Sequence, residues 1–184
     1  MASQLPKVIG IVGPVRAGKT TVTKYLVERY GYSLASNSAI LRTILSDMGL
    51  EQTRDNLSVL GNSLFSMFGN DLLARYRIET LGLDRIVVDG IRYSEELTRY
   101  RTIPQFKLLG VRAADEARFE RALLNSEEFK DKELTRVKFD QMVFSRSEMH
   151  VPALLDQADK VIDNNASLSQ LLSEVDQAIE SWIA

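Results

Sequence analysis

The stretch KVIGIVGPVRAGKT, residues 7–20, decides the fold of this chain. Its first part, residues 7–12, is a mostly β-branched run that is typical of a buried strand. Its second part, residues 13–20, fits the pattern G-x-x-x-x-G-K-[ST], and apolar residues then recur with helical spacing from Gly18 to about Tyr30. The sequence therefore predicts a strand, a glycine-rich turn and a helix in direct succession, which is the context that this pattern requires.

The turn at residues 13–20 is suited to hold phosphate groups. Glycines let backbone N–H groups converge on a phosphate, and the N-terminus of the following helix adds partial positive charge. We expect Lys19 to reach the β and γ phosphates of ATP and Thr20 to ligate Mg²⁺. Arg16 either contacts a phosphate or points to solvent at the rim of the loop. The candidate nucleotide-binding residues of this segment are Gly13, Arg16, Ala17, Gly18, Lys19, Thr20 and Thr21.

A second motif, VVDGIR at residues 87–92, lies at the end of a predicted strand. Asp89 is placed to hold the magnesium shell or an acceptor group, although D-G is also a common turn dipeptide. Hydrolytic motor ATPases usually place a glutamate beside this aspartate, where this chain has Gly90, and the N-K-x-D element of GTPases has no match. The motif therefore favours phosphoryl transfer to a small acceptor.

Strands and helices are predicted to alternate along the whole chain. Further strand-like runs occupy residues 32–35, 85–89, 106–111 and 160–163. Thr53, Ser94 and Ser167 are expected to cap helices, the last in a capping box with Gln170, and the apolar pattern of residues 57–68 is assigned to the core. Residues 125–150 are highly charged and are expected to be the most mobile part. This alternation predicts an α/β fold, a parallel sheet with helices on both faces.

Composition excludes several classes of protein. The 184 residues, 45% hydrophobic and 26% charged, predict one globular domain spanning residues 1–184. A net charge of −2 gives no reason to expect nucleic acid or a membrane as partner. Without cysteine there is no disulfide or cysteine zinc site, and the lone His150, expected to be structural or exposed, cannot form a multi-histidine metal site. No apolar run has the length of a signal peptide or membrane span, so we expect a cytoplasmic protein.

With these motifs the chain resembles, over nearly its full length, the P-loop kinases of nucleoside monophosphates. Residues 38–42, SAILR, resemble the G-D-x-L-R segment of adenylate kinases, and DGIR resembles their D-G-F-P-R. The resemblance implies a three-layer αβα sandwich around a parallel sheet of about five strands in the order 2-3-1-4-5. It also implies a helical acceptor-binding region at residues 36–82 and a lid at residues 125–150. The implied acceptor-binding residues are Ser38, Arg42, Arg75 and Arg92.

The resemblance implies further roles on the donor side. Residues 114–121 resemble the helix that enters the lid, where an arginine at the position of Arg121 covers the donor base. Arg136 and Arg146 resemble the paired lid arginines that reach the transferring phosphoryl group, and Asn164 lies in the segment that borders adenine. A solvated helix face or surface pair is the alternative for Arg118, Arg136 and Arg146. The candidate catalytic residues are Lys19, Asp89, Arg121, Arg136 and Arg146, with Thr20 and Asp89 as metal ligands.

Departures from the family pattern bear on the acceptor. Ala39 stands where adenylate kinases have aspartate, Asn125 stands where many have another lid arginine, and Arg16 resembles the loop of phage-type deoxynucleoside monophosphate kinases. We expect transfer of the γ-phosphoryl group of Mg·ATP to a nucleoside or deoxynucleoside monophosphate, by a monomer or homodimer. One alternative is transfer to a ribose hydroxyl, as in dephospho-CoA kinases, with Asp89 as base. Another is a sensor or interaction module that binds ATP with little transfer.

Overall fold

The central sheet is the frame of the molecule. The computed structural model describes residues 5–80, 82, 84–124, 134–146 and 148–183. Within these ranges one sheet of five parallel strands has the order β2-β3-β1-β4-β5, as expected. The strands are β1 (Val8–Val12), β2 (Ser33–Ser36), β3 (Ile86–Asp89), β4 (Phe106–Arg112) and β5 (Lys160–Asp163).

Strand β1 lies at the centre and pairs with β3 on one side and β4 on the other. Val8 is opposite both Ile86 and Phe106 in the two ladders. After β1 the chain forms β2 at one edge of the sheet, and β3 then fills the position between β2 and β1. Strands β4 and β5 follow on the other side of β1. Such a reversal of direction opens a crevice at the carboxyl ends of the strands, which is where ligands bind in open α/β sheets.

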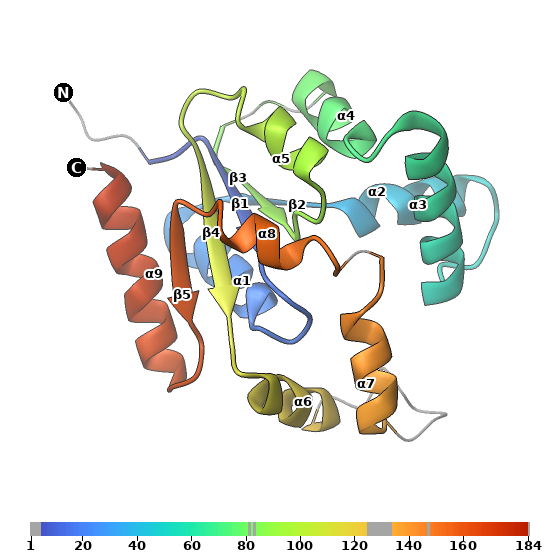
Figure 1. Cartoon of the computed structure of the whole chain (residues 1–184). Helices are drawn as coiled ribbons and strands as arrows, with labels where there is room; N and C mark the ends of the chain where they lie inside the picture. Colours follow the sequence, from blue (N-terminus) through green and yellow to red (C-terminus); the bar gives the residue numbers. More distant parts are fainter. Residues whose placement is uncertain (1–4, 81, 83, 125–133, 147, 184) are drawn as a thin grey trace.

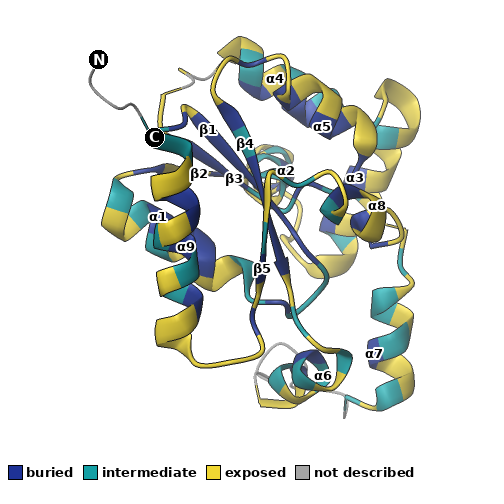
Figure 2. Ribbon diagram, turned by 60° about the vertical axis from the view of Figure 1, so that its left-hand side comes forward, coloured by how far each residue is buried: buried dark blue, intermediate teal, exposed yellow. Residues whose placement is uncertain are grey.

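Two core clusters cover the two faces of the sheet, and alternate residues of β1 point to each. Ile9 and Ile11 pack with α1 (Lys19–Tyr30) and α9 (Leu168–Ile183). On the other face Val8 and Val12 pack with α4 (Leu72–Thr80), α5 (Ser94–Tyr100) and α8 (Val151–Leu155). Figure 2 shows these two groups of helices on opposite sides of the buried strands. The expected three-layer αβα architecture is confirmed.

A helical region follows β2 and lies at one side of the sheet (Figure 1). It contains α2 (Asn37–Asp47) and α3 (Arg54–Phe68), and Thr53 caps α3 as predicted by accepting a hydrogen bond from the N–H of Asn56. Leu57 is buried against Leu41 in a small separate cluster. Assigning the whole pattern of residues 57–68 to the core was wrong, because its end reaches solvent and Met67 is 74% exposed.

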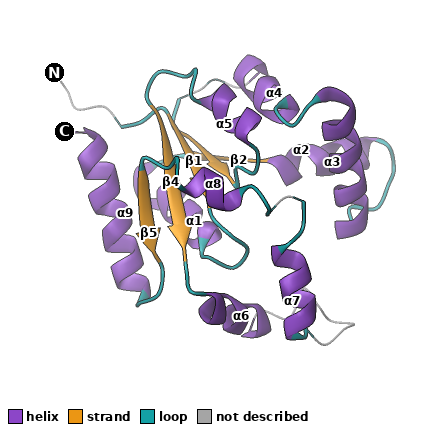
Figure 3. Ribbon diagram, in the orientation of Figure 1, coloured by secondary structure: helices purple, strands orange, loops and turns teal. Residues whose placement is uncertain are grey.

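Two helices from the second half of the chain, α6 (Asp115–Leu124) and α7 (Arg136–Val143), lie together below the sheet in Figure 3. A helix was expected at the position of α6. Helix α7 falls in the segment predicted to be mobile, and α8 was not predicted. Residues 125–133 and 147 of the expected lid lie outside the described residues. His150 is exposed, and its ring contacts Tyr93.

Two cap predictions need correction. Tyr93, not Ser94, holds the N-cap position of α5, and it makes no side-chain cap bond. Ser167 does accept a hydrogen bond from the N–H of Gln170, but the side chain of Gln170 donates to Glu174 instead of completing a capping box. The longest helix described, α9, has 16 residues, and no helix in the described ranges has the length and apolar character needed to cross a membrane.

Candidate active site

A cleft of about 870 Å³ lies at the carboxyl ends of the strands. Four groups of residues line it, from the phosphate loop, from the start of α2 and the face of α3, from the loop after β3, and from α6 and the end of α7. The predicted site residues among them are Arg16, Gly18, Lys19, Thr20, Thr21, Ser38, Asp89, Arg92, Arg121 and Arg146. The structure therefore brings motifs that are more than 100 residues apart in sequence to one cavity.

The phosphate loop packs against β4 and against the loop after β5. A Cβ atom on residue 13 would lie 2.1 Å from the carbonyl oxygen of Val111, and one on residue 18 would lie 2.3 Å from Nδ2 of Asn164. Gly18 also has a φ of +106°, a conformation that favours glycine. Nδ2 of Asn164 donates to the carbonyl oxygen of Ala17 (2.8 Å). Asn164, predicted to border adenine, is buried here as a support of the loop.

The side chain of Lys19 points back to the first residues of the phosphate loop. Its Nζ donates to the carbonyl oxygens of Gly13 (2.7 Å) and Pro14 (2.8 Å). Burial, and then the positive charge of Arg92, lower the pKa of Lys19 to about 7, while the charges of Glu148 and Asp89 oppose this shift. A bound phosphate would supply the negative charge that this ammonium group needs.

Glu148 is a site residue that sequence analysis missed. Its Oε2 accepts a hydrogen bond from the backbone N–H of Val15 in the phosphate loop (2.9 Å), and its Oε1 accepts one from Nη1 of Arg92. The residue is only 8% exposed. It lies 133 positions from Val15 in a charged segment without any motif, so no local signal marks it.

Two arginines of α6 hold the outer side of the phosphate loop. Nη1 of Arg118 donates to the carbonyl oxygen of Val15 (3.3 Å), and Nη1 of Arg121 donates to that of Arg16 (3.5 Å). Arg121 also donates to the carbonyl oxygen of Asn164 (2.7 Å). Arg118 is 7% exposed, so the alternative of a solvated helix face does not apply to it. Helix α6 therefore fixes the loop to the loop after β5.

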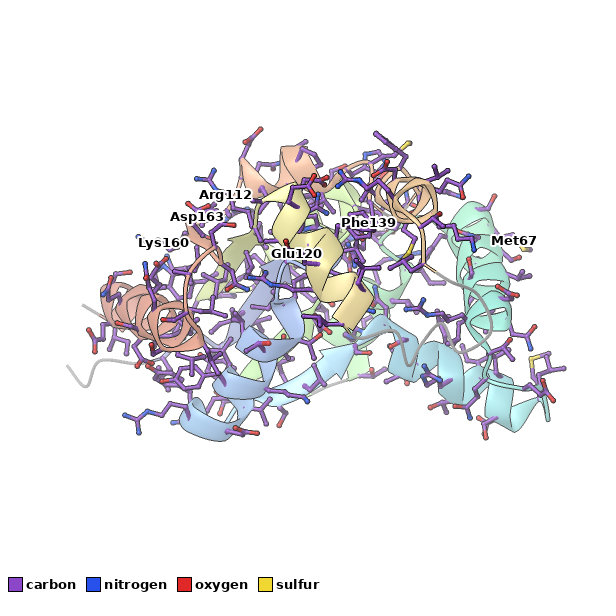
Figure 4. All side chains as sticks on the ribbon, turned by 90° about the horizontal axis from the view of Figure 1, so that it is seen from below. Met67, Arg112, Glu120, Phe139, Lys160 and Asp163 are labelled. Carbon is purple, nitrogen blue, oxygen red and sulfur yellow. The ribbon has the colours of Figure 1, made fainter. Side chains whose placement is uncertain are left out.

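The two predicted lid arginines have different surroundings. Arg146 lines the cleft, next to Ser145. Arg136 is paired with the carboxylates of Asp115, Glu116 and Asp140, and its guanidinium lies over the rings of Phe119 and Phe139. It is not among the residues that line the cleft. Figure 4 shows Phe139 of α7 close to α6. In this structure Arg136 therefore joins the two helices, and Arg146 faces the site.

The predicted acceptor-binding residues also separate into two groups. Ser38 and Arg92 line the cleft. Arg42 and Arg75 are not among the described residues that line the cleft. Arg42 donates instead to the carbonyl oxygen of Gln52, and Arg75 pairs with Asp71. One face of α3 also lines the cleft, and it includes Leu57 and Phe65 from the pattern that was assigned to the core. The lining residues of α3 follow i, i+3 and i+4 spacing: Arg54, Leu57, Ser58, Gly61, Asn62 and Phe65.

A buried carboxylate holds the acceptor side in place. Glu96 of α5 accepts hydrogen bonds from the backbone N–H of Arg92 (3.0 Å) and from Nδ2 of Asn37 (3.3 Å). Only 1% of the residue is exposed, and burial raises the pKa of its carboxyl group. Glu96 thereby joins the loop after β3 to the start of α2, which positions Arg92 relative to Ser38.

The donor set fits a magnesium ion shared with phosphates. Thr20 and Asp89 line the same cleft and offer a hydroxyl and a carboxylate oxygen. Mg²⁺ prefers such oxygens, and it usually takes one or two from the protein and the rest from phosphates and water. Among the described residues, no cluster of three or more acidic or histidine side chains forms a separate metal site.

Comparisons with known proteins identify the family and the fold of the chain. Residues 9–142 match the family described as an AAA domain. A UPF0200 protein of Sulfurisphaera tokodaii is 25% identical over 96% of this chain and 97% of its own. A shikimate kinase structure from Bacteroides thetaiotaomicron has a TM-score of 0.61 at 15% identity and covers 95% of this chain and 97% of its own. A dephospho-CoA kinase structure from Campylobacter jejuni has a TM-score of 0.55 at 14% identity and covers 95% of this chain and 96% of its own. The expected P-loop kinase fold is confirmed, and the chain belongs to the AAA domain family.

Proposed function

We propose that this protein transfers the γ-phosphoryl group of Mg·ATP to a nucleoside or deoxynucleoside monophosphate. The observation that supports this most is that one cleft joins the phosphate loop to a second wall formed by α2 and α3. Arg92 lies between the two parts, where it can bind an acceptor phosphate. The proposal includes an acceptor-binding region at residues 36–82 and a lid at residues 125–150.

On the donor side, the N–H groups of the phosphate loop and the N-terminus of α1 bind the phosphates. Lys19 leaves its two carbonyl partners and contacts the β and γ phosphates. Thr20 and Asp89 would hold the magnesium ion, which when bound offsets charge on the phosphate oxygens. Arg121, which lines the cleft, would cover the donor base.

In the transfer step an oxygen of the acceptor phosphate attacks the γ-phosphorus in line with the leaving group. A bond forms between that oxygen and the γ-phosphorus, and the bond from the γ-phosphorus to the β,γ-bridging oxygen breaks, so that ADP leaves. A monophosphate is already ionised and needs no base. Lys19, Arg92 and Arg146 offset the charge that develops on the transferred group, and positioning supplies most of the catalysis.

The second wall of the cleft suits a planar, partly polar acceptor. Leu57, Phe65 and Tyr93 form an apolar surface, and Ser58 and Asn62 add hydrogen-bonding groups beside it. Apolar surfaces with a few placed polar groups are typical of sites for small molecules with aromatic rings. A nucleobase satisfies both features while its phosphate contacts Arg92.

A hydroxyl acceptor is the second candidate. It is favoured by the position of Asp89 in the cleft, where a carboxylate can take the proton of an attacking hydroxyl. The structural neighbours named as shikimate and dephospho-CoA kinases support the same candidate by analogy.

A transfer assay with the full chain decides between the candidates. Radiolabelled Mg·ATP is incubated with AMP, dAMP, CMP and dTMP in parallel with shikimate and dephospho-CoA. We expect label in a diphosphate product, and none with Lys19→Met, which keeps the length of the side chain but removes its charge. Label in shikimate or dephospho-CoA would support the hydroxyl candidate. Binding of ATP without transfer to any acceptor would favour a sensor or interaction module.

A further inference from the structure

The carboxylate of Glu148 is surrounded by groups that the proposed function assigns to phosphate. Val15 N–H and Arg92 both donate to it, and the residue is almost fully buried. Its negative charge also acts on Lys19 and Arg118, where it opposes the lowering of their pKa by burial. One carboxylate thus interacts with a loop amide and three cations.

The contact with Val15 lies at the γ-phosphate end of the loop. The β-phosphate is bound by the glycine-rich turn and the N-terminus of α1. Lys19, which bridges the β and γ phosphates in such loops, points to the carbonyl oxygens of Gly13 and Pro14, the residues just before Val15. A γ-phosphate in contact with Lys19 would therefore approach the amide that Glu148 now engages.

Two anions cannot share these donors at low cost. A γ-phosphate and a carboxylate in hydrogen-bond range of the same amide would repel each other in a partly buried site. The phosphate carries more charge and more acceptor oxygens, so it is the stronger competitor for Val15 and Lys19. Displacing the carboxylate would also break its ion pair with Arg92.

We propose that Glu148 is a positioning residue that occupies the γ-phosphate end of the loop, holds Arg92 there, and is displaced when ATP binds. Arg92 is then released to contact the acceptor phosphate, so acceptor binding follows donor binding. This inference rests on the proposed function. Glu148 is poorly placed to act as a base instead, because each of its carboxylate oxygens already accepts a hydrogen bond, Oε1 from Arg92 and Oε2 from Val15.

The test compares a diphosphate with a triphosphate. The affinities of Mg·ADP and of magnesium β,γ-imido-ATP are measured by titration calorimetry for the wild type and Glu148→Gln. Glutamine keeps the shape of the side chain and an acceptor oxygen but has no charge. Glu120→Gln is the matched control, because Glu120 is exposed on α6 (Figure 4).

We expect the wild type to bind the triphosphate no more tightly than ADP. Glu148→Gln should bind the triphosphate at least about fivefold more tightly than the wild type does, with little change for ADP. Glu120→Gln should match the wild type for both ligands.

Three results would overturn the inference: a wild type that binds the triphosphate at least about fivefold more tightly than ADP, an unchanged triphosphate affinity in Glu148→Gln, or an equal gain for ADP. If Glu148→Gln does not fold, the wild-type ratio alone decides. If the wild type binds neither nucleotide, the proposed function itself fails, which is a distinct outcome.

Discussion

Gly13 lies directly against the carbonyl oxygen of Val111, so that a Cβ atom on residue 13 would be 2.1 Å from that oxygen. The contact joins the start of the phosphate loop to the neighbouring strand β4. Val111 lies within β4 and Gly13 directly follows β1, so neither residue can move away cheaply. The first glycine of the motif is therefore required for packing, in addition to its proposed role in binding phosphate.

Gly13→Ala should consequently destabilise the protein by about 3 kcal/mol or more and weaken nucleotide binding. Thermal melting and denaturant titration measure the first effect, and calorimetry with Mg·ADP measures the second. Gly82→Ala is the matched control, because nothing lies within 4 Å of a Cβ atom there. Equal stability of the two variants would show that the loop can shift away from β4.

Binding of nucleotide should take up a proton at Lys19. The pKa of this residue is lowered to about 7, so at pH 8 its side chain is mostly neutral, and nearby phosphates would raise the pKa again. The complex then holds more protons than the free protein, and the affinity for Mg·ADP should fall as the pH rises from 7 to 9.

Calorimetry in HEPES and in Tris at pH 8 should report an uptake of nearly one proton per ADP. Lys19→Met should show no uptake and a flat pH dependence. If the wild type also lacks proton uptake, the ammonium group of Lys19 is charged before the nucleotide binds, and the interpretation of its surroundings is wrong.

The two proposed lid arginines should differ in their effect on catalysis. Arg146 lines the cleft, so Arg146→Ala should lower kcat by about 100-fold or more through lost stabilisation of the transferring group. Arg136 is occupied by three carboxylates, so Arg136→Ala should lower the melting temperature and change kcat by less than about tenfold. Steady-state kinetics and melting of both variants test this. A larger kcat loss for Arg136→Ala would mean that the arginine leaves its carboxylates during the reaction.

Arg92 and Arg42 should likewise differ in acceptor binding. Arg92→Ala should raise the KM for the acceptor by about tenfold or more, because the residue lines the cleft where the acceptor phosphate is proposed to bind. Arg42→Ala should change this KM by less than about twofold, because its guanidinium is bonded to the carbonyl oxygen of Gln52. Kinetics at saturating Mg·ATP measure both values. A strong effect of Arg42→Ala would restore the role that its family resemblance implies.

The sequence by itself determined the sheet, its flanking helices and the phosphate loop. The segment at residues 7–20 combines a β-branched run, a glycine pattern and the start of a helix, and each of these is a local signal. Asp89 was found in the same way, at the end of a strand within a six-residue motif, whereas the role expected of Arg92 came from the family resemblance. The strand order came from the resemblance to a known family, and the structure confirms it.

Only the tertiary structure decided which of the remaining charged residues lie at the cleft or contact the phosphate loop. Glu148, Arg136 and Arg146 lie in one charged segment. The family resemblance singled out the two arginines but not Glu148, and no local signal separates Arg136 from Arg146. Packing of α6 against α7 places Arg136 among carboxylates, whereas the chain just after α7 brings Glu148 to the amide of Val15. The interaction of a charged group depends on the sign and distance of neighbours from the whole fold, and these distances do not exist until the strands and helices have packed.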